Sequence, residues 1–274
     1  MLFQSESTAA KSFENTRPLN SLDWNAKVSL KIETKKYIVS IADNSKDLYE
    51  ALELRHQVFC EEFSELDQNL SAMDELDPYS DVLYVRDKKS NRIIASYRLI
   101  HSSLSPKFYS SSEFDLSPFL EEKGGKVELS RACVHADFRK GMILHLLWKG
   151  VAAYMAKTGA RYLFGLTSIQ TYDIKVILDI YRYLYSQGYV GSEYEIQPTL
   201  KHNLINWYGL SHYHEKSPLS DLPDETPSLL MSYLNAGAKV YGPPAIDHDF
   251  GCFDFFTLLD FEKLSKAHVK KYTS

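Results

Sequence analysis

The spacing of hydrophobic and polar residues divides the chain from residue 28 onward into strands and helices. Alternation with a period of two predicts strands, and apolar positions three and four residues apart predict helices. Strands are predicted over 28–42 (one or two strands), 82–85, 93–100, 126–134, 161–168, 239–240 and 252–259. Helices are predicted over 45–59, 140–158, 174–185, 227–236 and 261–267. Because the two types alternate regularly only in the middle of the chain, we expect an α/β (α+β) fold, with a mixed, partly antiparallel sheet and helices on both faces.

Three segments fall outside this pattern. Residues 1–25 are polar and mixed in charge, so we expect a flexible N-terminal arm followed by a single domain over 26–274. Residues 61–81 are acidic, and Pro78 disfavours a helix there, which predicts a loop. Residues 193–226 are rich in Pro, Ser and His, and we expect a lid-like insertion.

The predicted strand 126–134 carries the most unusual residues. Glu128, Ser130 and Arg131 interrupt an apolar run, and charges are rarely buried without partners. A Lys140-Gly141 turn then opens a long apolar helix, whose free N–H groups favour an anion such as a phosphate. Glu128 and Arg131 are an odd number of residues apart, so a regular strand places them on opposite faces. If they share a site, the strand has to bulge or splay between them.

Composition and charge narrow the classes of protein. A net charge of −5 argues against a generally nucleic-acid-binding surface. The three cysteines lie far apart and none forms a CxxC pair, which favours a reduced, cytoplasmic compartment. The best membrane-spanning candidate, 142–156, is interrupted by His145 and Lys149 and is shorter than the roughly 20 apolar residues of a span.

The charged residues around this strand resemble a known family. Glu128-Leu-Ser-Arg131, on a strand before a helix, resembles the core of the GCN5-related N-acyltransferases (GNAT), in the branch of the acyl-homoserine lactone (autoinducer) synthases. The upstream signature also fits, in the order Arg55, Phe59, Asp74, Asp77 and Arg98. The resemblance implies a GNAT-like sheet with a splayed central strand.

Longer blocks resemble one branch more closely, the ornithine-lipid-forming N-acyltransferases, which are also related to the N-acyl amino acid synthases. The blocks run from about residue 46 to about 264 and include Ser96-Tyr-Arg-Leu-Ile100, Ser130-Arg-Ala-Cys-Val-His-Ala-Asp-Phe-Arg139 and Pro244-Ala-Ile-Asp-His-Asp-Phe-Gly251. This resemblance implies transfer of a long-chain, 3-hydroxy acyl group from acyl-carrier protein to the α-amine of ornithine. It implies acyl-carrier protein as partner, with acyl-CoA as the alternative cosubstrate and no further cofactor, and peripheral contact with the inner face of the membrane through the lipid product.

The implied reaction is attack of an amine on a thioester, in which positioning contributes up to about 7–11 kcal/mol and a general base about 10²–10⁴-fold. Glu128 is the first choice for the base, directly or through a water, with Arg131 beside it in the catalytic set. On that reading, Glu128→Gln removes most of kcat with little loss of fold. The alternative makes Glu128 a structural partner of Arg98 or Arg131.

Two further sets follow from the resemblance. The resemblance assigns acceptor binding to Arg98, Asp74, Asp77 and Arg55. The alternative is that these charges only join the acidic loop to the sheet. The resemblance assigns acyl-donor binding to Cys133, Val134, His135, Arg139, Lys140 and Gly141. Cys133 fits a small buried core residue better than a nucleophile. We expect no metal site, although His212 and His214 have a spacing that a metal can use.

Competing functions remain at this point. A change of acceptor gives an N-acyl amino acid or acyl-homoserine-lactone-type signal synthase. The homoserine lactone product is disfavoured, because the tryptophan that autoinducer synthases place after the Arg/Phe pair is missing here. A different class is a non-catalytic acyl-carrier or lipid-binding module. A long apolar tunnel at the splayed strand would favour the long-chain enzyme.

Overall fold

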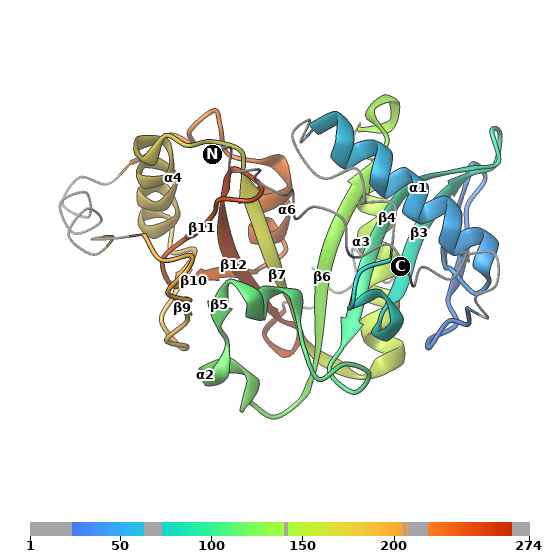
Figure 1. The fold of residues 1–274 in the computed structure, drawn as a ribbon, viewed down its shortest axis with the longest axis horizontal. Coiled ribbons are helices and arrows are strands. Elements are labelled where there is room, and N and C mark those ends of the chain that lie inside the picture. The colour runs from blue at the N-terminus through green and yellow to red at the C-terminus, as the bar shows by residue number, and fades with distance from the viewer. Residues whose placement is uncertain (1–23, 63–72, 140–141, 205–206, 208–218, 265–274) are drawn as a thin grey trace, which may run out of the picture.

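A large mixed β-sheet forms the centre of the protein (Figure 1). The computed structural model describes residues 24–62, 73–139, 142–204, 207 and 219–264. The strands lie in the order β1-β2-β3-β4-β6-β7-β12-β10-β8, and β11 pairs with β12. Their bounds are Lys31–Glu33 (β1), Tyr37–Ile41 (β2), Asp81–Asp87 (β3), Arg92–His101 (β4), Gly125–Val134 (β6), Ala160–Ile169 (β7), Val190–Gly191 (β8), Lys239–Tyr241 (β10), Ala245–Asp247 (β11) and Cys252–Asp260 (β12).

All neighbouring strands in this sheet are antiparallel except two pairs, β6 with β7 and β8 with β10. The predicted mixed, partly antiparallel sheet is therefore confirmed. A separate pair joins β5 (Phe114–Asp115) to β9 (Gln197–Pro198). The α-helices are α1 (Ser45–Glu62), α2 (Ser117–Leu120), α3 (Met142–Thr158), α4 (Ile174–Ser186) and α6 (Ser228–Asn235). Short 3₁₀ turns are η2 (Asp77–Tyr79), η3 (Tyr109–Ser112), η4 (Ala136–Phe138) and η5 (Phe261–Lys263).

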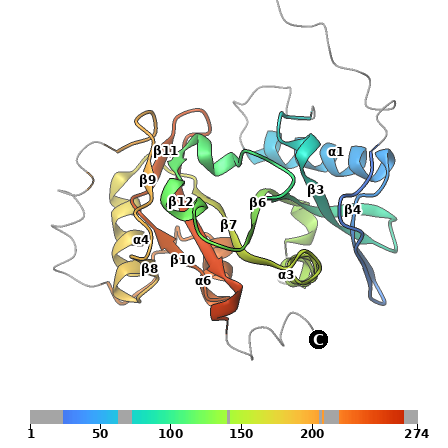
Figure 2. The same cartoon turned by 90° about the horizontal axis from the view of Figure 1, so that it is seen from below.

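Helices α1 and α3 cover opposite faces of the first half of the sheet, as Figure 2 shows. Alternation along β3 divides its side chains between them, because successive residues point to opposite faces. Leu83 and Val85 pack in the core with α3, whereas Val82 and Tyr84 pack with α1. The predicted helices on both faces are confirmed.

The second half of the sheet is sandwiched in the same way. Phe253 and Phe255 of β12 pack in one core with α4 and α6. Phe256 and Leu258 face the other side, where Phe119 of α2 completes an aromatic core. The two halves of the sheet meet at β6 and β7, which are central in the strand order.

Several element ends differ from their sequence predictions. Asn44 caps α1, which was predicted to begin at residue 45, because its Oδ1 accepts the Asp47 N–H at 2.9 Å. Trp24, assigned to the arm from sequence, is buried, and its Nε1 donates to the Ala42 carbonyl; residues 1–23 lie outside the described residues. The described beginning of the expected lid is packed, since Ile196 is fully buried. The sequence missed strands β5, β8, β9 and β11, which have only two or three residues each and so show little alternation.

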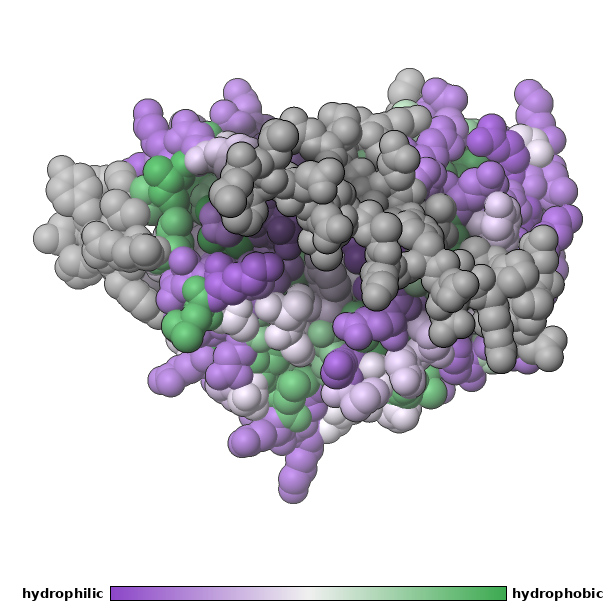
Figure 3. Space-filling view, in the orientation of Figure 1, coloured by the Kyte–Doolittle hydropathy of each residue, from purple (hydrophilic) through white to green (hydrophobic). Residues whose placement is uncertain are grey.

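In the described ranges, no helix is long and apolar enough to cross a bilayer. The face drawn in Figure 3 carries many hydrophilic side chains, and its hydrophobic side chains form separate patches.

Candidate functional site

Strands β6 and β7 part halfway along their length. They pair in parallel from Gly125 and Ala160 to Leu129 and Gly165, and no pair follows although both strands continue. Figure 1 shows the two ribbons diverging. Gly165 permits the close approach at the vertex, since a Cβ there would lie 2.3 Å from the Leu129 carbonyl oxygen. The predicted splay of the central strand is confirmed.

A β-bulge in β6 coincides with this splay. Ser96 of β4 pairs with Cys133 and Arg98 pairs with Ser130, so Arg131 and Ala132 together face Tyr97. Arg131 has a φ of 54°, a left-handed conformation that costs a side-chain-bearing residue energy and is common in bulges. The bulge reorients the strand, and Arg131 and Arg98 both contact Asp74. A bulge is therefore present between Glu128 and Arg131, at Arg131 itself, although only Arg131 lines the cavity described below.

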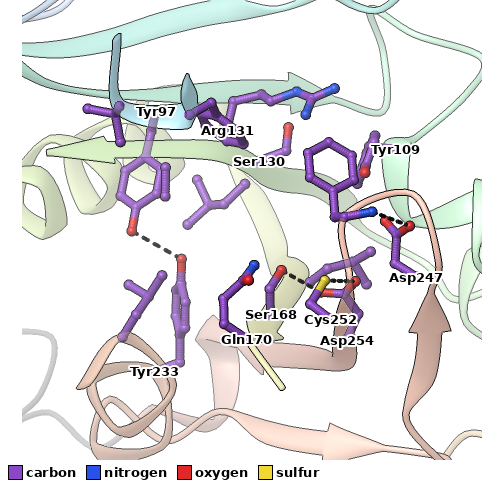
Figure 4. A pocket seen from close by; sticks show the side chains of 17 residues that line it. Tyr97, Tyr109, Ser130, Arg131, Ser168, Gln170, Tyr233, Asp247, Cys252 and Asp254 are labelled. Atoms are coloured by element: carbon purple, nitrogen blue, oxygen red, sulfur yellow. Dashed lines mark hydrogen bonds between the residues drawn. The ribbon is translucent and has the colours of Figure 1, made fainter. Parts of the chain in front are cut away.

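A cavity of about 230 Å³ opens where the strands part (Figure 4). Its apolar lining includes Leu129, Leu166 and Leu229. Its remaining wall is formed by Tyr97, Tyr109, Ser130, Arg131, Ser168, Gln170, Tyr233, Asp247, Cys252 and Asp254. Among the described residues predicted for catalysis or acceptor binding, Arg131 alone lines this cavity.

Aromatic rings surround the Arg131 guanidinium. Its central carbon lies 5.0 Å from the ring centre of Tyr109, 5.7 Å from that of Phe59 and 6.0 Å from that of Phe250. Its Nη2 also lies 3.3 Å from Asp74 Oδ2. Rings on several sides hold the cation in place through cation–π attraction. A positioned guanidinium of this kind can bind a carboxylate by donating two parallel hydrogen bonds to it.

The other predicted acceptor residues form an ion-pair network beside the cavity. Asp77 is fully buried and makes two bonds with Arg55, at 3.0 and 2.9 Å. Arg98 Nη1 lies 2.6 Å from each oxygen of Asp74. Although burial acts to raise the pKa of Asp74, the charges of Arg98 and Arg131 hold that pKa well below its usual value. These geometries favour the alternative reading, in which the charges join the acidic loop to the sheet.

Glu128 is fully buried and does not line the cavity. Its two oxygens accept the backbone N–H groups of Tyr109 and Ser110, both at 2.7 Å, and the Ser110 hydroxyl at 2.5 Å. Burial raises the pKa of Glu128, against the effect of these hydrogen bonds and of Arg98. The first choice for the base thus makes no contact with the cavity. It fixes η3, which carries Tyr109 into the cavity wall.

This arrangement changes the expected effect of Glu128→Gln. The amide N–H₂ would face the N–H groups of η3, and one buried donor would lose its acceptor. We expect the free energy of unfolding to fall by about 1–3 kcal/mol, measured by urea denaturation. Glu121→Gln, on an exposed side chain, is the control and should have no effect. A variant as stable as the wild type but without kcat would instead restore Glu128 as the base.

Acidic groups that the sequence prediction missed also lie at the cavity. Asp254 accepts the Ser168 hydroxyl at 2.5 Å and shares a hydrogen bond with Glu113. Burial, followed by the charges of Asp254 and Asp247, raises the pKa of Glu113 to about 9. Burial also raises the pKa values of Asp254 and of the Cys252 thiol. A lone Asp within the apolar run Cys252-Phe-Asp-Phe-Phe is the same signal that singled out Glu128, so it could have been found.

These groups bear on the expectation that the chain has no metal site. One ligand atom each of Asp247, Cys252 and Asp254 lies within 4.8 Å of the others, which is close enough for one cation. His212 and His214, the residues weighed from sequence, lie outside the described residues.

The predicted donor residues follow the end of β6 toward α3. Cys133 is buried in the core beneath α1, as its small size suggested. Val134 pairs with Ala95, and the His135 Nδ1 accepts the Asp137 N–H at 3.3 Å. Arg139 is exposed, and its Nε donates to the Val134 carbonyl. Lys140 and Gly141 lie outside the described residues.

Comparison with known proteins finds similarity to a family model, to curated relatives and to solved structures. Residues 54–149 match the family model described as an acetyltransferase (GNAT) domain. An L-ornithine N(alpha)-acyltransferase of Rhodobacter capsulatus is 27% identical over 252 residues, covering 86% of this chain and 95% of that protein. One of Brucella abortus is 25% identical over 263 residues, covering 85% and 88%. Among solved structures, the AHL synthase LasI has a TM-score of 0.49 at 12% identity, covering 85% of this chain and 94% of that one.

Proposed function

We propose that this chain, an acyltransferase that carries a GNAT domain, acylates the α-amine of ornithine with a long-chain, 3-hydroxy acyl group from acyl-carrier protein. The amine nitrogen attacks the thioester carbonyl, the C–S bond breaks, and the thiol leaves with the proton as the amide forms. The relatives' names support ornithine as the acceptor. The product is a lipid, so we place the enzyme on the cytoplasmic side of a membrane, in peripheral contact with it.

The observation that carries this proposal is the cavity at the parting of β6 from β7, with Arg131 in its wall. Two reactants can meet there with the acceptor's carboxylate on Arg131. Holding them in a reactive geometry supplies the largest share of the rate, up to about 7–11 kcal/mol. Glu128, through η3, then acts as a positioning residue for Tyr109.

The acyl chain needs an apolar path from this cavity. A void of about 10 Å³ shares Leu129 and Tyr233 with it and is lined by Leu163, Leu258 and Leu259. The hydroxyls of Tyr97 and Tyr233, two residues of the cavity wall, are hydrogen-bonded to each other at 3.3 Å (Figure 4). We propose that these two tyrosines separate to admit a long acyl chain. Each methylene then buried contributes about 0.8 kcal/mol.

In this proposal, the turn between β6 and α3 binds the phosphate of the acyl donor. Arg139 is exposed at this turn and can pair with an acidic carrier protein. In the sequence, bulky Met142, Ile143 and Leu144 follow Gly141, where small residues would let a pyrophosphate approach the backbone. This pattern favours the single phosphate of a carrier protein over coenzyme A.

Mass spectrometry of lipids from cells that express the protein tests the proposal. We expect new lipids in which ornithine carries an amide-linked 3-hydroxy acyl group, and none with the empty vector. An acyl-homoserine lactone or another N-acyl amino acid would identify one of the alternative acceptors. Purified protein that transfers no acyl group, with acyl-carrier protein and candidate amines supplied, would refute the function.

A further inference from the structure

Three buried carboxylic acids gather beside the cavity. Asp247 and Asp254 line the cavity wall, and Glu113 contacts Asp254. Glu113 and Asp254 are each 2% exposed and Asp247 is 6% exposed. Figure 4 shows Asp247 and Asp254 on one side of the cavity, with Arg131 on the strand along its upper edge. The cavity thus has a cationic wall and an acidic wall.

These acids differ from the others near the site. Asp74 and Asp77 are neutralised by Arg55, Arg98 and Arg131. In the described part of the chain, no salt bridge reaches Glu113, Asp247 or Asp254, and the largest charge effects on the pKa of Glu113 come from the acids Asp254, Asp247 and Glu128. Burial raises the pKa values of Glu113 and Asp254, and a bound cation would favour their ionised forms, since an opposite charge nearby lowers the pKa of a carboxyl.

One atom of the cluster also lacks a hydrogen-bond partner. Glu113 Oε2 is buried and accepts no hydrogen bond among the described residues. Buried polar atoms are satisfied in most native proteins, and an exception points to a missing donor. Asp247 Oδ1, by contrast, accepts the N–H groups of Asp249 and Phe250, which fix its orientation. The site therefore has a preorganised acid and an unsatisfied acceptor next to the cavity.

We propose that Glu113, Asp247 and Asp254 form the subsite that binds the side-chain ammonium of a dibasic amino acid, and so select a basic acceptor. This inference rests on the proposed function. The acceptor's carboxylate lies on Arg131 and its distal ammonium on the acidic wall, where three N–H donors match the carboxyl groups. Asp74 and Asp77, which the sequence assigned to acceptor binding, are paired with arginines instead.

Two acceptors that differ only in the distal amine test this subsite: ornithine and norvaline. Acyl transfer from acyl-carrier protein by the purified full chain gives kcat/KM for each. We expect ornithine to exceed norvaline by roughly 10- to 100-fold, the effect of one charge-assisted contact. Equal values for the two acceptors would overturn the subsite while leaving the acyltransferase function intact. If no acyl group is transferred to either acceptor or to other amines, the proposed acyltransferase function itself, on which the subsite rests, is refuted.

Variants of the acidic wall separate selection from folding. In Asp254→Asn the ornithine-to-norvaline ratio of kcat/KM should fall toward one, through a higher KM for ornithine. A purely structural role would lower both values equally and leave the ratio unchanged, which contradicts the proposal. Glu113→Gln is the second variant if Asp254→Asn does not fold. The matched control is Asp249→Asn, an exposed side chain two residues from Asp247, and its ratio should equal that of the wild type.

A divalent cation is the competing occupant. Mg²⁺ or Zn²⁺ alone is titrated into the protein, and calorimetry follows the binding. We expect no metal binding that depends on Asp254, so the wild type and Asp254→Asn should give the same result. Tight binding of either metal that disappears in this variant, together with an unchanged ornithine-to-norvaline ratio, would replace the ammonium subsite by a metal site.

Discussion

Arg131→Gln is expected to raise KM for the amine acceptor by about 10- to 100-fold and to leave kcat nearly unchanged. The proposed role of this guanidinium is to hold the acceptor's carboxylate, and a charge-assisted pair of hydrogen bonds is lost with it. A contact made equally in the ground state and the transition state appears in KM rather than in kcat. Steady-state kinetics with varied ornithine at saturating acyl donor measure this split.

Arg131→Lys should recover only part of the loss, because lysine keeps the charge but lacks the planar fork of donors. Arg92→Gln is the control, since Arg92 is exposed at the start of β4. Wild-type KM in Arg131→Gln would exclude Arg131 from acceptor binding. A fall in kcat alone would move its role to the transition state.

Stability is expected to decrease as pH rises from about 5 to 9, owing to Glu113. Burial, followed by the charges of Asp254 and Asp247, raises the pKa of this carboxyl from 4.5 to about 9. Below pH 4.5 folded and unfolded chains both keep the proton, so the contribution is complete there. At higher pH the unfolded chain loses the proton and the folded chain retains it. The free energy of unfolding then falls by up to about 1.4 kcal/mol per pH unit, and the contribution is lost as pH reaches about 9.

Urea denaturation of wild type and Glu113→Gln at pH 5.5 and 8.5 measures this effect. Glutamine does not titrate, so the variant should gain stability relative to the wild type at the higher pH. Asp247, Asp254 and Glu128 face Glu113 in both proteins, and their contributions largely cancel in the difference. Glu225→Gln, on an exposed side chain, should follow the wild type at both pH values. Parallel curves for wild type and Glu113→Gln would show that Glu113 is ionised in the folded protein.

The sequence located the central strand and its irregularity but not the partners of its charges. Glu128 stood out because a charge within an apolar strand requires a partner, and it has three hydrogen bonds. The donors belong to a turn 18 and 19 residues earlier, and no periodicity connects that turn to β6. The choice between base and structural partner therefore needed the distances.

The acidic residues show the same limit. The loop residues Asp74 and Asp77 were conspicuous in the sequence, whereas Asp254 stood alone in an apolar strand. Local sequence does not show which acids are neutralised, because Arg55, Arg98 and Arg131 come from a helix and two strands. The fold pairs Asp74 and Asp77 with arginines and places Asp254 in the cavity wall.

Hydrophobic periodicity by itself predicted the mixed sheet and most of its longer strands and helices, because these depend on neighbours along the chain. The helix predicted over 261–267 is an exception, since its first residues form the 3₁₀ turn η5. Tertiary structure decided which charges meet and which face the cavity. Those contacts join segments that only the packing of β6, β7 and β12 brings together, and burial sets their protonation.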